Sequence, residues 1–183
     1  MILFADTNVL LDLQKINLLK AFFSLKKQIC IEESIFYDEL LEPKGIQEEL
    51  LENGLLCVSM SDEEFTLARK VYEKNPKLSF YDCVAFAVAK CREWDLLTGD
   101  KRLRRYAEVH QVKVHGLLWT VRECEQAGIE LMVLFKALRI IYNEPRIRIP
   151  NKLVLAMCLG IVIRKYRRHR KTIDYYVCLD SCV

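Results

Sequence analysis

The chain contains few residues that break regular structure, with six Gly and four Pro among 183 residues. This composition excludes a collagen-like or low-complexity chain. Long apolar runs are also missing: the run that comes nearest, residues 153–163, is about half as long as a membrane-spanning helix. The N-terminal MILFADTN lacks the basic segment and cleavage site of a signal peptide. We therefore expect a globular protein that stays in the cytoplasm and does not enter a membrane.

Metal-binding Cys and His motifs and nucleotide-binding Gly motifs are absent too. No C-x-x-C occurs, and none of the three His residues is near a Cys pair, which argues against a zinc site. No P-loop, G-x-G-x-x-G or G-x-S-x-G occurs, which argues against nucleotide kinases, dinucleotide enzymes and serine hydrolases. The eight Cys are interpreted as reduced thiols, because six of them lie singly among apolar residues, as buried thiols do: Cys30, Cys57, Cys83, Cys91, Cys124 and Cys158.

Charge is distributed unevenly behind a net charge of +3. Residues 151–183 contain seven Lys and Arg but two Asp, a balance of +5, whereas the other 150 residues carry 21 basic and 23 acidic side chains. The basic segment RKYRRHRK at residues 164–171 has two open interpretations, a nucleic-acid contact or a solvated appendage. Residues 1–150 are thus slightly acidic, and the positions of their Asp and Glu side chains are considered next.

Short apolar segments alternate with helical patterns along the chain, which predicts an α/β fold with a mostly parallel sheet covered on both faces. We expect one domain over residues 1–150, followed by a C-terminal helix and basic tail at 151–183. The expected strands are 2–5, 28–31, 55–59, 96–98 and 112–114. The expected helices are 9–13, 18–26, 34–41, 46–51, 62–74, 79–92, 101–109, 116–127, 130–142 and 151–163. Ser61 and Glu64 have the spacing of a capping box at the start of the helix 62–74.

Two of the predicted strands end in an acid, ILFAD in Asp6 and LLTGD in Asp100. Ligands of parallel α/β sheets gather at the carboxyl ends of the strands, so these carboxylates are candidate functional groups. The alternative is helix capping, because each acid also precedes a predicted helix.

Two further acids lie at helix positions that face the interior. At 100° per residue, Glu39 falls between Ile35 and Phe36. Asp82 is the only charged residue between Leu78 and Ala89. We therefore expect its carboxylate to be buried. A structural role, in a cap or beside a buried Arg, is the alternative for each acid taken alone.

Four carboxylates at one place require a counter-charge. Two of them about 5 Å apart repel by about 3 kcal/mol at an effective dielectric near 20. An all-oxygen site without His or Cys selects Mg²⁺ or Mn²⁺. Such ions activate water for attack on phosphate esters, so phosphodiester hydrolysis is the predicted chemistry, with Glu39 or Asp6 helping to remove the proton.

These motifs resemble, in order and spacing, the PIN-domain nucleases, most closely the VapC-type toxin ribonucleases. The resemblance covers residues 1 to about 140 and rests on ILFADTNVLLDL (2–13), FYDELLE (36–42), LSFYDCVAFAVAK (78–90) and LLTGDKRLRRYAEVHQVKVHGLLWTV (96–121). It implies a three-layer α/β/α sandwich, Mg²⁺-dependent cleavage of single-stranded RNA, and an antitoxin protein as partner. The site residues that it implies are the metal ligands Asp6, Glu39, Asp82 and Asp100, with Asn8 and Thr98 orienting them or the bound water.

The chain departs from the family pattern after Asp100. Where many members carry another acid or Asn, this sequence has Arg102, Arg104 and Arg105, which places a second metal ion in doubt. These arginines are candidates for contacts with RNA phosphates, with a solvated helix face as the alternative. Phe22, Phe23 or the helix 130–142 are candidates for a homodimer face.

Three functional classes remain after this comparison. The leading one is a metal-dependent endoribonuclease, and the second is a PIN-like module that binds RNA or a protein without cutting. The third, a phosphate-accepting receiver domain, ranks low because ADTN supplies one acid where a receiver has paired acids. The substitution Asp6→Asn separates the first two classes.

Overall fold

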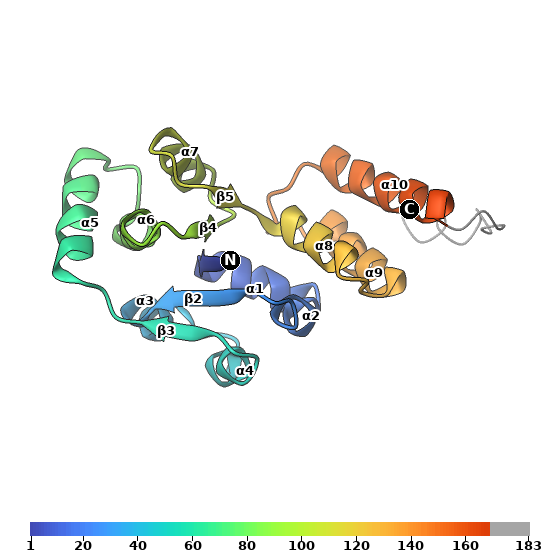
Figure 1. The fold of residues 1–183 in the computed structure, drawn as a ribbon, viewed down its shortest axis with the longest axis horizontal. Helices are drawn as coiled ribbons and strands as arrows, with labels where there is room; N and C mark the ends of the chain where they lie inside the picture. The colour runs from blue at the N-terminus through green and yellow to red at the C-terminus, as the bar shows by residue number, and fades with distance from the viewer. Residues whose placement is uncertain (169–183) are drawn as a thin grey trace.

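The structure, a computed structural model, describes the backbone of residues 1–168 and the side chains of residues 1–164. Its centre is a five-stranded sheet in the order β3-β2-β1-β4-β5, and every neighbouring pair is parallel (Figure 1). The strands are β1 (Ile2–Ala5), β2 (Gln28–Glu32), β3 (Leu56–Val58), β4 (Asp95–Leu97) and β5 (Val114–His115). The helices are α1 (Thr7–Lys15), α2 (Leu19–Phe23), α3 (Glu33–Glu39), α4 (Ile46–Glu52), α5 (Asp62–Lys74), α6 (Phe80–Cys91), α7 (Lys101–Val109), α8 (Leu117–Gln126), α9 (Leu131–Asn143) and α10 (Asn151–Arg168).

Helices cover both faces of this sheet. Strands β2 and β3 follow β1 toward one edge of the sheet, whereas β4 and β5 lie on the other side of β1. Because connections between parallel strands are right-handed, the helices before and after this reversal lie on opposite faces of the sheet. Helices α5, α6 and α7 form one layer, in which α6 contacts β1, β2 and β4, while α1, α2, α3 and α8 are linked by contacts in the other layer. The predicted three-layer α/β/α sandwich is confirmed.

Helix α6 is the best-buried helix of its layer because its sequence is apolar nearly all round. All residues of 83–89 are buried. The helix starts at a capping box in which Ser79 and Asp82 exchange hydrogen bonds. The capping box predicted for α5 is also present, since Ser61 and Glu64 bond each other's backbone N–H groups.

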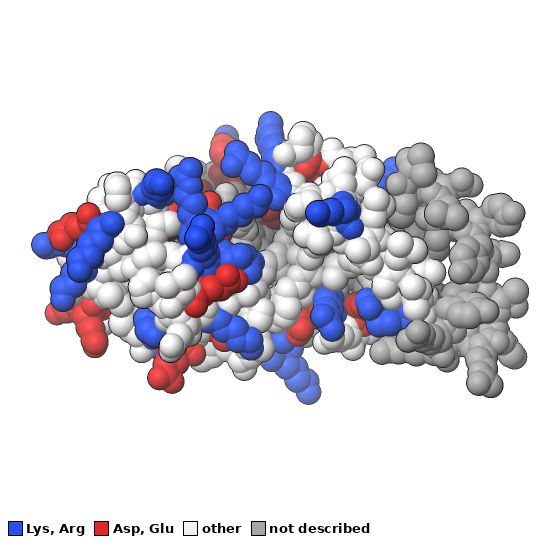
Figure 2. Space-filling view, turned by 90° about the horizontal axis from the view of Figure 1, so that it is seen from above, with Lys and Arg blue, Asp and Glu red and all other residues white. Residues whose placement is uncertain are grey.

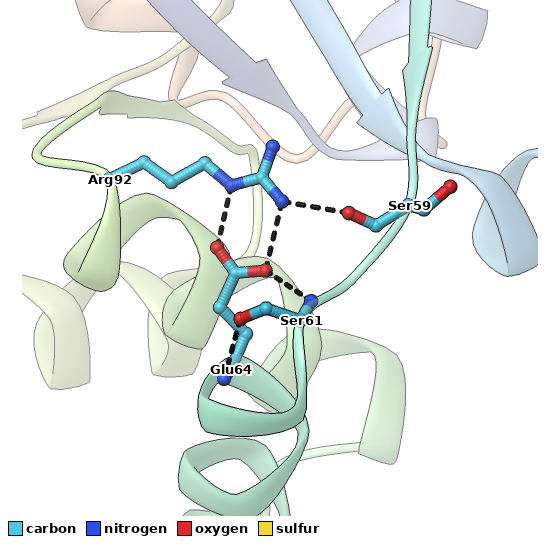
Figure 3. Close-up of polar contacts among 4 residues, drawn as sticks. All are labelled: Ser59, Ser61, Glu64 and Arg92. Carbon is cyan, nitrogen blue, oxygen red and sulfur yellow. Dashed lines mark hydrogen bonds and ion pairs between the residues drawn. The ribbon is translucent and has the colours of Figure 1, made fainter.

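An ion pair joins the start of α5 to the end of α6 (Figure 3). Arg92 donates from Nε and Nη2 to the two carboxylate oxygens of Glu64 at 2.6 and 2.9 Å, and Nη2 also donates to the carbonyl of Ser59 at 2.7 Å. Glu64 is buried, and its hydrogen bond with Arg92 lowers the pKa of the carboxyl group. One guanidinium therefore fixes the β3–α5 connection against α6.

The predicted element ends shift by a few residues. Strand β5 begins at Val114 rather than residue 112, because the N–H of Val112 bonds the carbonyl of Ala107 and closes the end of α7. Helix α3 ends at Glu39 rather than at residue 41. Its start is capped by the buried carboxylate of Glu32, which accepts from the N–H groups of Ser34 and Ile35. Glu32 was not predicted from the sequence to have this role.

Two expectations about apolar side chains need correction. Among the six cysteines in the described part of the chain, Cys57 and Cys91 are exposed, because β3 is an edge strand and Cys91 lies at the end of α6. Phe22 is fully buried beside Trp119, so it cannot form a dimer face.

Helix α10 packs on α8 and α9 through Val154 and Ile161, which are buried, and it extends past the predicted end at residue 163. The rest of the basic tail, residues 169–183, lies outside the described residues. The domain boundary at residue 150 stays a prediction. Within residues 1–168, no helix is both long and apolar enough to cross a bilayer.

Candidate active site

A cavity of about 160 Å³ is lined by all four acids that the sequence singled out, Asp6, Glu39, Asp82 and Asp100. It lies where β1 and β4 end, and the chain leaves these two neighbouring strands in opposite directions along the sheet. Such a reversal opens a crevice at the carboxyl ends of the strands. The rest of its lining is Phe4, Asn8, Ile35, Ser79, Tyr81 and Ala85.

Strand pairing sets the position of Asp6. Ala5 is in register with Leu97, and the N–H of Asp6 donates to the carbonyl of Leu97 at 2.9 Å. The next residue on β4's side, Thr98, is fully buried and donates its hydroxyl to Oδ2 of Asp6 at 2.7 Å. Thr98 Oγ1 in turn accepts from the N–H of Asp100 at 3.0 Å. One threonine thus links the two strand-end acids, residues that are 94 positions apart in the numbering.

Thr7 makes the corresponding link to Glu39. Its hydroxyl donates to Oε2 of Glu39 at 2.7 Å and lies 3.4 Å from Oδ1 of Asp6. Thr7 is not among the site residues predicted from the sequence, although its place directly after the strand-end acid was the available signal. Glu39 is at the last position of α3 and is exposed, so the predicted inward position is corrected to one at the rim of the cavity.

The capping alternative is also realised for three of the acids. Asp6 and Asp100 are the N-cap residues of α1 and α7, and Oδ1 of Asp100 accepts from the N–H groups of Arg102 and Leu103 at 2.7 and 2.8 Å. Asp82 completes the capping box of α6 through Oδ2 and is partly exposed, which corrects the prediction of a buried carboxylate. Capping and lining the cavity are therefore compatible roles, because each cap uses one carboxylate oxygen.

The electrostatics show that the acids are close enough to interact. The pKa of Asp6 is raised to about 6, chiefly by burial and also by the Asp82 and Glu39 carboxylates, while the hydrogen bonds from Thr98 and the Asn8 N–H lower it. In the part of the chain that is described, the ion pairs of Lys, Arg and His go to other acids, and none includes these four. Negative charge in this cavity is thus left without a protein cation.

The donor set suits a hard dication, although the carboxylates are not drawn together around one point. Glu39, Asp82 and Asp100 each use a single oxygen in the hydrogen bonds above, which leaves Oε1, Oδ1 and Oδ2 respectively for another partner. Carboxylate oxygens are the ligands that Mg²⁺ and Mn²⁺ prefer. Among the described residues, however, no three His, Cys, Asp or Glu side chains form a group that could hold a metal ion as they stand.

The supporting residues fall in different places. Asn8 is exposed and lines the cavity, whereas Thr98 acts from beneath it through the two bonds above. Tyr81, which the sequence did not single out, also lines the cavity and donates its hydroxyl to Oδ2 of Asp38 at 2.6 Å. No pattern in the sequence marks Tyr81 apart from its position beside Asp82.

The three arginines of α7 do not act as one group. Arg104 donates to the carbonyls of Thr98 at 3.2 Å and Val114 at 3.4 Å, so its guanidinium ties α7 to the end of β4 and the start of β5. A contact between RNA and any of the three arginines stays a prediction. Arg102 and Arg105 are exposed and line a different hollow.

The match to a known protein family covers most of the chain. A family model described as a PIN domain matches residues 2–158. No curated protein matches the chain. A similar solved structure is that of a PilT N-terminus domain protein from the hyperthermophilic archaeon Sulfolobus solfataricus P2, with 13% identity, a TM-score of 0.46, and coverage of 68% of this chain and 93% of that chain.

Proposed function

The chain belongs to the PIN-domain family, and from that membership we propose that it is a metal-dependent endoribonuclease that cuts single-stranded RNA. One observation carries the proposal: four carboxylates from the β1–α1 junction, α3, α6 and the β4–α7 turn line one cavity, and none pairs with a cation among the described residues. Metal-assisted hydrolysis of phosphate esters uses hard oxygen ligands of this kind.

Each residue has a separate task in this proposal. Asp6, Asp82 and Asp100, with Glu39 directly or through water, are the ligands of Mg²⁺ or Mn²⁺. When bound, such an ion polarises a phosphoryl oxygen and lowers the pKa of water. Glu39 or Asp6 accepts the proton of the attacking water, and Thr98 and Thr7 hold these two carboxylates in place.

The toxin role is the finer part of the proposal and rests on the resemblance to VapC-type ribonucleases. An antitoxin would silence such an enzyme by covering the acidic cavity. A polypeptide with basic side chains fits this purpose, because the cavity's negative charge has no cation of its own among the described residues.

A second candidate is a PIN-like module that binds RNA or protein without cutting. The observation that favours it is that no group of three or more potential ligands in the described chain is arranged to hold an ion. The enzyme therefore requires small movements of carboxylates on binding the ion, whereas the module requires none.

The test compares the wild type with Asp6→Asn on a labelled single-stranded RNA, in Mg²⁺, in Mn²⁺ and in EDTA. The enzyme proposal expects cleavage that needs the ion and that falls by at least about 10²-fold in the variant, as when an essential catalytic group is lost. Binding of Mn²⁺, followed by its electron paramagnetic resonance signal, should weaken in the same variant. A wild type that binds RNA but cuts none of a mixed pool under any divalent ion establishes the module instead.

A further inference from the structure

A second hollow, of about 590 Å³, lies beside the acidic cavity and has the opposite charge. Four cations from three parts of the chain line it: Lys74 at the end of α5, Lys77 in the α5–α6 connection, and Arg102 and Arg105 on α7. The rest of its lining is Asn75, Pro76, Leu78, Tyr106 and Val109, with no acid among them. We refer to this hollow as the basic groove.

The basic groove is continuous in sequence with the acidic cavity on both sides. Leu78 lines the groove and the next residue, Ser79, lines the cavity. On the other side, the N–H of Arg102 donates to Oδ1 of Asp100 at 2.7 Å, while Nη1 of Arg102 donates to the carbonyl of Lys77 at 3.2 Å. Arg102 therefore lies at the junction, and a polymer that leaves the cavity past Asp100 and Ser79 enters the groove.

The cations of the groove are available to a ligand. Within the described residues, Arg69, Arg92 and Arg104 form ion pairs with nearby glutamates, whereas none of the four groove cations forms an ion pair. Figure 2 looks down on the side of the molecule where α7 lies and shows Lys and Arg side chains gathered around a hollow there. Unpaired cations lining a concave surface are the electrostatic footprint of a phosphate backbone.

An aromatic ring is fixed at the side of the groove. The ring of Tyr106 is partly buried and lies 4.9 Å from Phe86 and 4.2 Å from His110, measured between ring centroids. Val109, in the same lining, is 71% exposed. Cations along a groove combined with aromatic and apolar surface are typical of proteins that hold single-stranded nucleic acid, because bases stack on the ring while the cations follow the backbone.

We propose that the basic groove holds the RNA strand on one side of the scissile phosphate, with Lys74, Lys77 and Arg105 contacting the phosphates of the nucleotides outside the cavity. The proposal rests on the proposed function for the position of the scissile bond. It names single-stranded RNA as the occupant, since the charge and the aromatic surface are found together. The groove residues position the substrate and take no part in the chemical step.

The experiment measures binding separately from cleavage. A single-stranded RNA is titrated in EDTA, by fluorescence anisotropy at several salt concentrations, with wild type, the double variant Lys74→Ala/Arg105→Ala, and the control Lys70→Ala. Lys70 is also exposed on α5 but does not line the groove. Removal of one phosphate-binding cation should lower the slope of log K against log salt by about 0.7, so the double variant should lose about 1.4 and the control nothing. In Mg²⁺ the double variant should raise KM and leave kcat unchanged, because only uniform binding is removed.

The outcomes separate this inference from the proposed function. An unchanged salt slope, or a loss shared equally by Lys70→Ala, overturns the groove whether or not RNA is cut. A wild type with no affinity for single-stranded RNA also overturns the groove. The same holds if the double substitution weakens the binding of a polyglutamate peptide but not the binding of RNA, since the groove would then bind acidic protein. If the wild type cuts nothing yet the slope falls as expected, the nuclease proposal fails and the groove stands. Circular dichroism of each variant shows that it is folded.

Discussion

Asp6 has two partly opposed roles, since it caps α1 and also has a carboxyl group whose pKa is raised by burial. Its backbone N–H is tied to Leu97 and its Oδ2 to Thr98, so the side chain cannot turn away from its acidic neighbours. The result is negative charge held in a place that disfavours it. This unfavourable charge is what gives a site its affinity for a cation, and it lowers stability while the cation is absent.

The pH dependence of stability should reveal this cost. The pKa of Asp6 is about 6 in the folded chain against the ordinary aspartate value of 3.8, so the folded state binds the proton more tightly. The stability contributed by this group is present below pH 3.8 and is lost as the pH rises through 6, by about 3 kcal/mol in total. In EDTA at pH 7.5, Asp6→Asn should therefore be more stable than wild type, and the difference should vanish near pH 3.5. Urea unfolding at the two pH values measures it, and parallel pH profiles for the two proteins would contradict it.

Thr98 should act on metal affinity through Asp6 and Asp100. In Thr98→Val the partly buried Asp100 N–H loses its acceptor and Asp6 its donor, which should lower the free energy of unfolding by about 1–3 kcal/mol. The Mg²⁺ concentration for half-maximal cleavage should rise on the order of tenfold, as when a residue that orients a ligand is lost. Thr98→Ser retains the hydroxyl and should behave like wild type in Mg²⁺ titrations. An unaltered Mg²⁺ requirement in Thr98→Val would limit Thr98 to a structural role.

At the scale of elements, the helices of the α5–α7 layer are held by polar ties as well as by apolar packing. Arg92 joins Ser59 and Glu64, and Arg104 joins the end of β4 and the start of β5 to α7. The aromatic side chains of Phe65, Tyr72 and Phe80 also meet between α5 and α6, in pairs with centroids 6.3 and 5.8 Å apart. These ties fix the segments that carry Ser79, Asp82 and Asp100.

Removal of the Arg92 guanidinium should be costly because it leaves Glu64 buried without its partner. Glu64 has 3% of its side chain exposed and Arg92 has 26%, so we expect Arg92→Ala to lose about 2–4 kcal/mol, somewhat below the loss for a fully buried pair. Arg69→Ala on α5 is the matched control, since the pair with Glu73 is more than half exposed on both sides and should contribute less than about 1 kcal/mol. Chemical denaturation of the two variants compares them, and equal losses would contradict the assignment.

This tie also has a defined pH dependence. The pKa of Glu64 is lowered in the folded chain, chiefly by its hydrogen bond with Arg92. The stability it contributes is present above the ordinary pKa of 4.5 and is lost as the pH falls through the lowered value. Below that pH the difference between wild type and Glu64→Gln should therefore disappear.

At the scale of the whole molecule, α10 is packed as part of the core although its sequence precedes a strongly basic segment. Ile161 and Val154 are fully or almost fully buried against the α8–α9 side, while Leu159 on the same helix is 62% exposed. Arg164 adds an ion pair with Glu125 of α8 at 2.8 Å. The helix should therefore unfold together with the sheet rather than separately from it.

Ile161→Ala tests this expectation against Leu159→Ala. Truncation of the buried Ile161 should cost about 2–5 kcal/mol, whereas truncation of the exposed Leu159 should change stability by less than about 0.5 kcal/mol. Both proteins should show a single thermal transition in calorimetry. Two separate transitions, or a small effect of Ile161→Ala, would make α10 an independent appendage.

Features that depend on neighbours along the chain could be predicted from the amino-acid sequence. The apolar run at residues 2–5 forms a strand, and the capping box of Ser61 and Glu64 starts α5. Asp6 and Asp100 lie just past the carboxyl ends of strands because each follows a buried apolar run. The order of its motifs also indicated the family. These signals are local, and local propensity and periodicity are enough to produce them.

Which of these residues meet depends on how the elements pack in three dimensions. The bond between Thr7 and Glu39 spans 32 positions and that between Asp6 and Thr98 spans 92, and both depend on strand order and helix packing that no local pattern contains. The same holds for the arginines of α7: Arg104 reaches the sheet while Arg102 and Arg105 line the groove, because successive residues of a helix project about 100° apart and meet different neighbours. A helical position fixes a direction, but what lies in that direction is set by the rest of the fold.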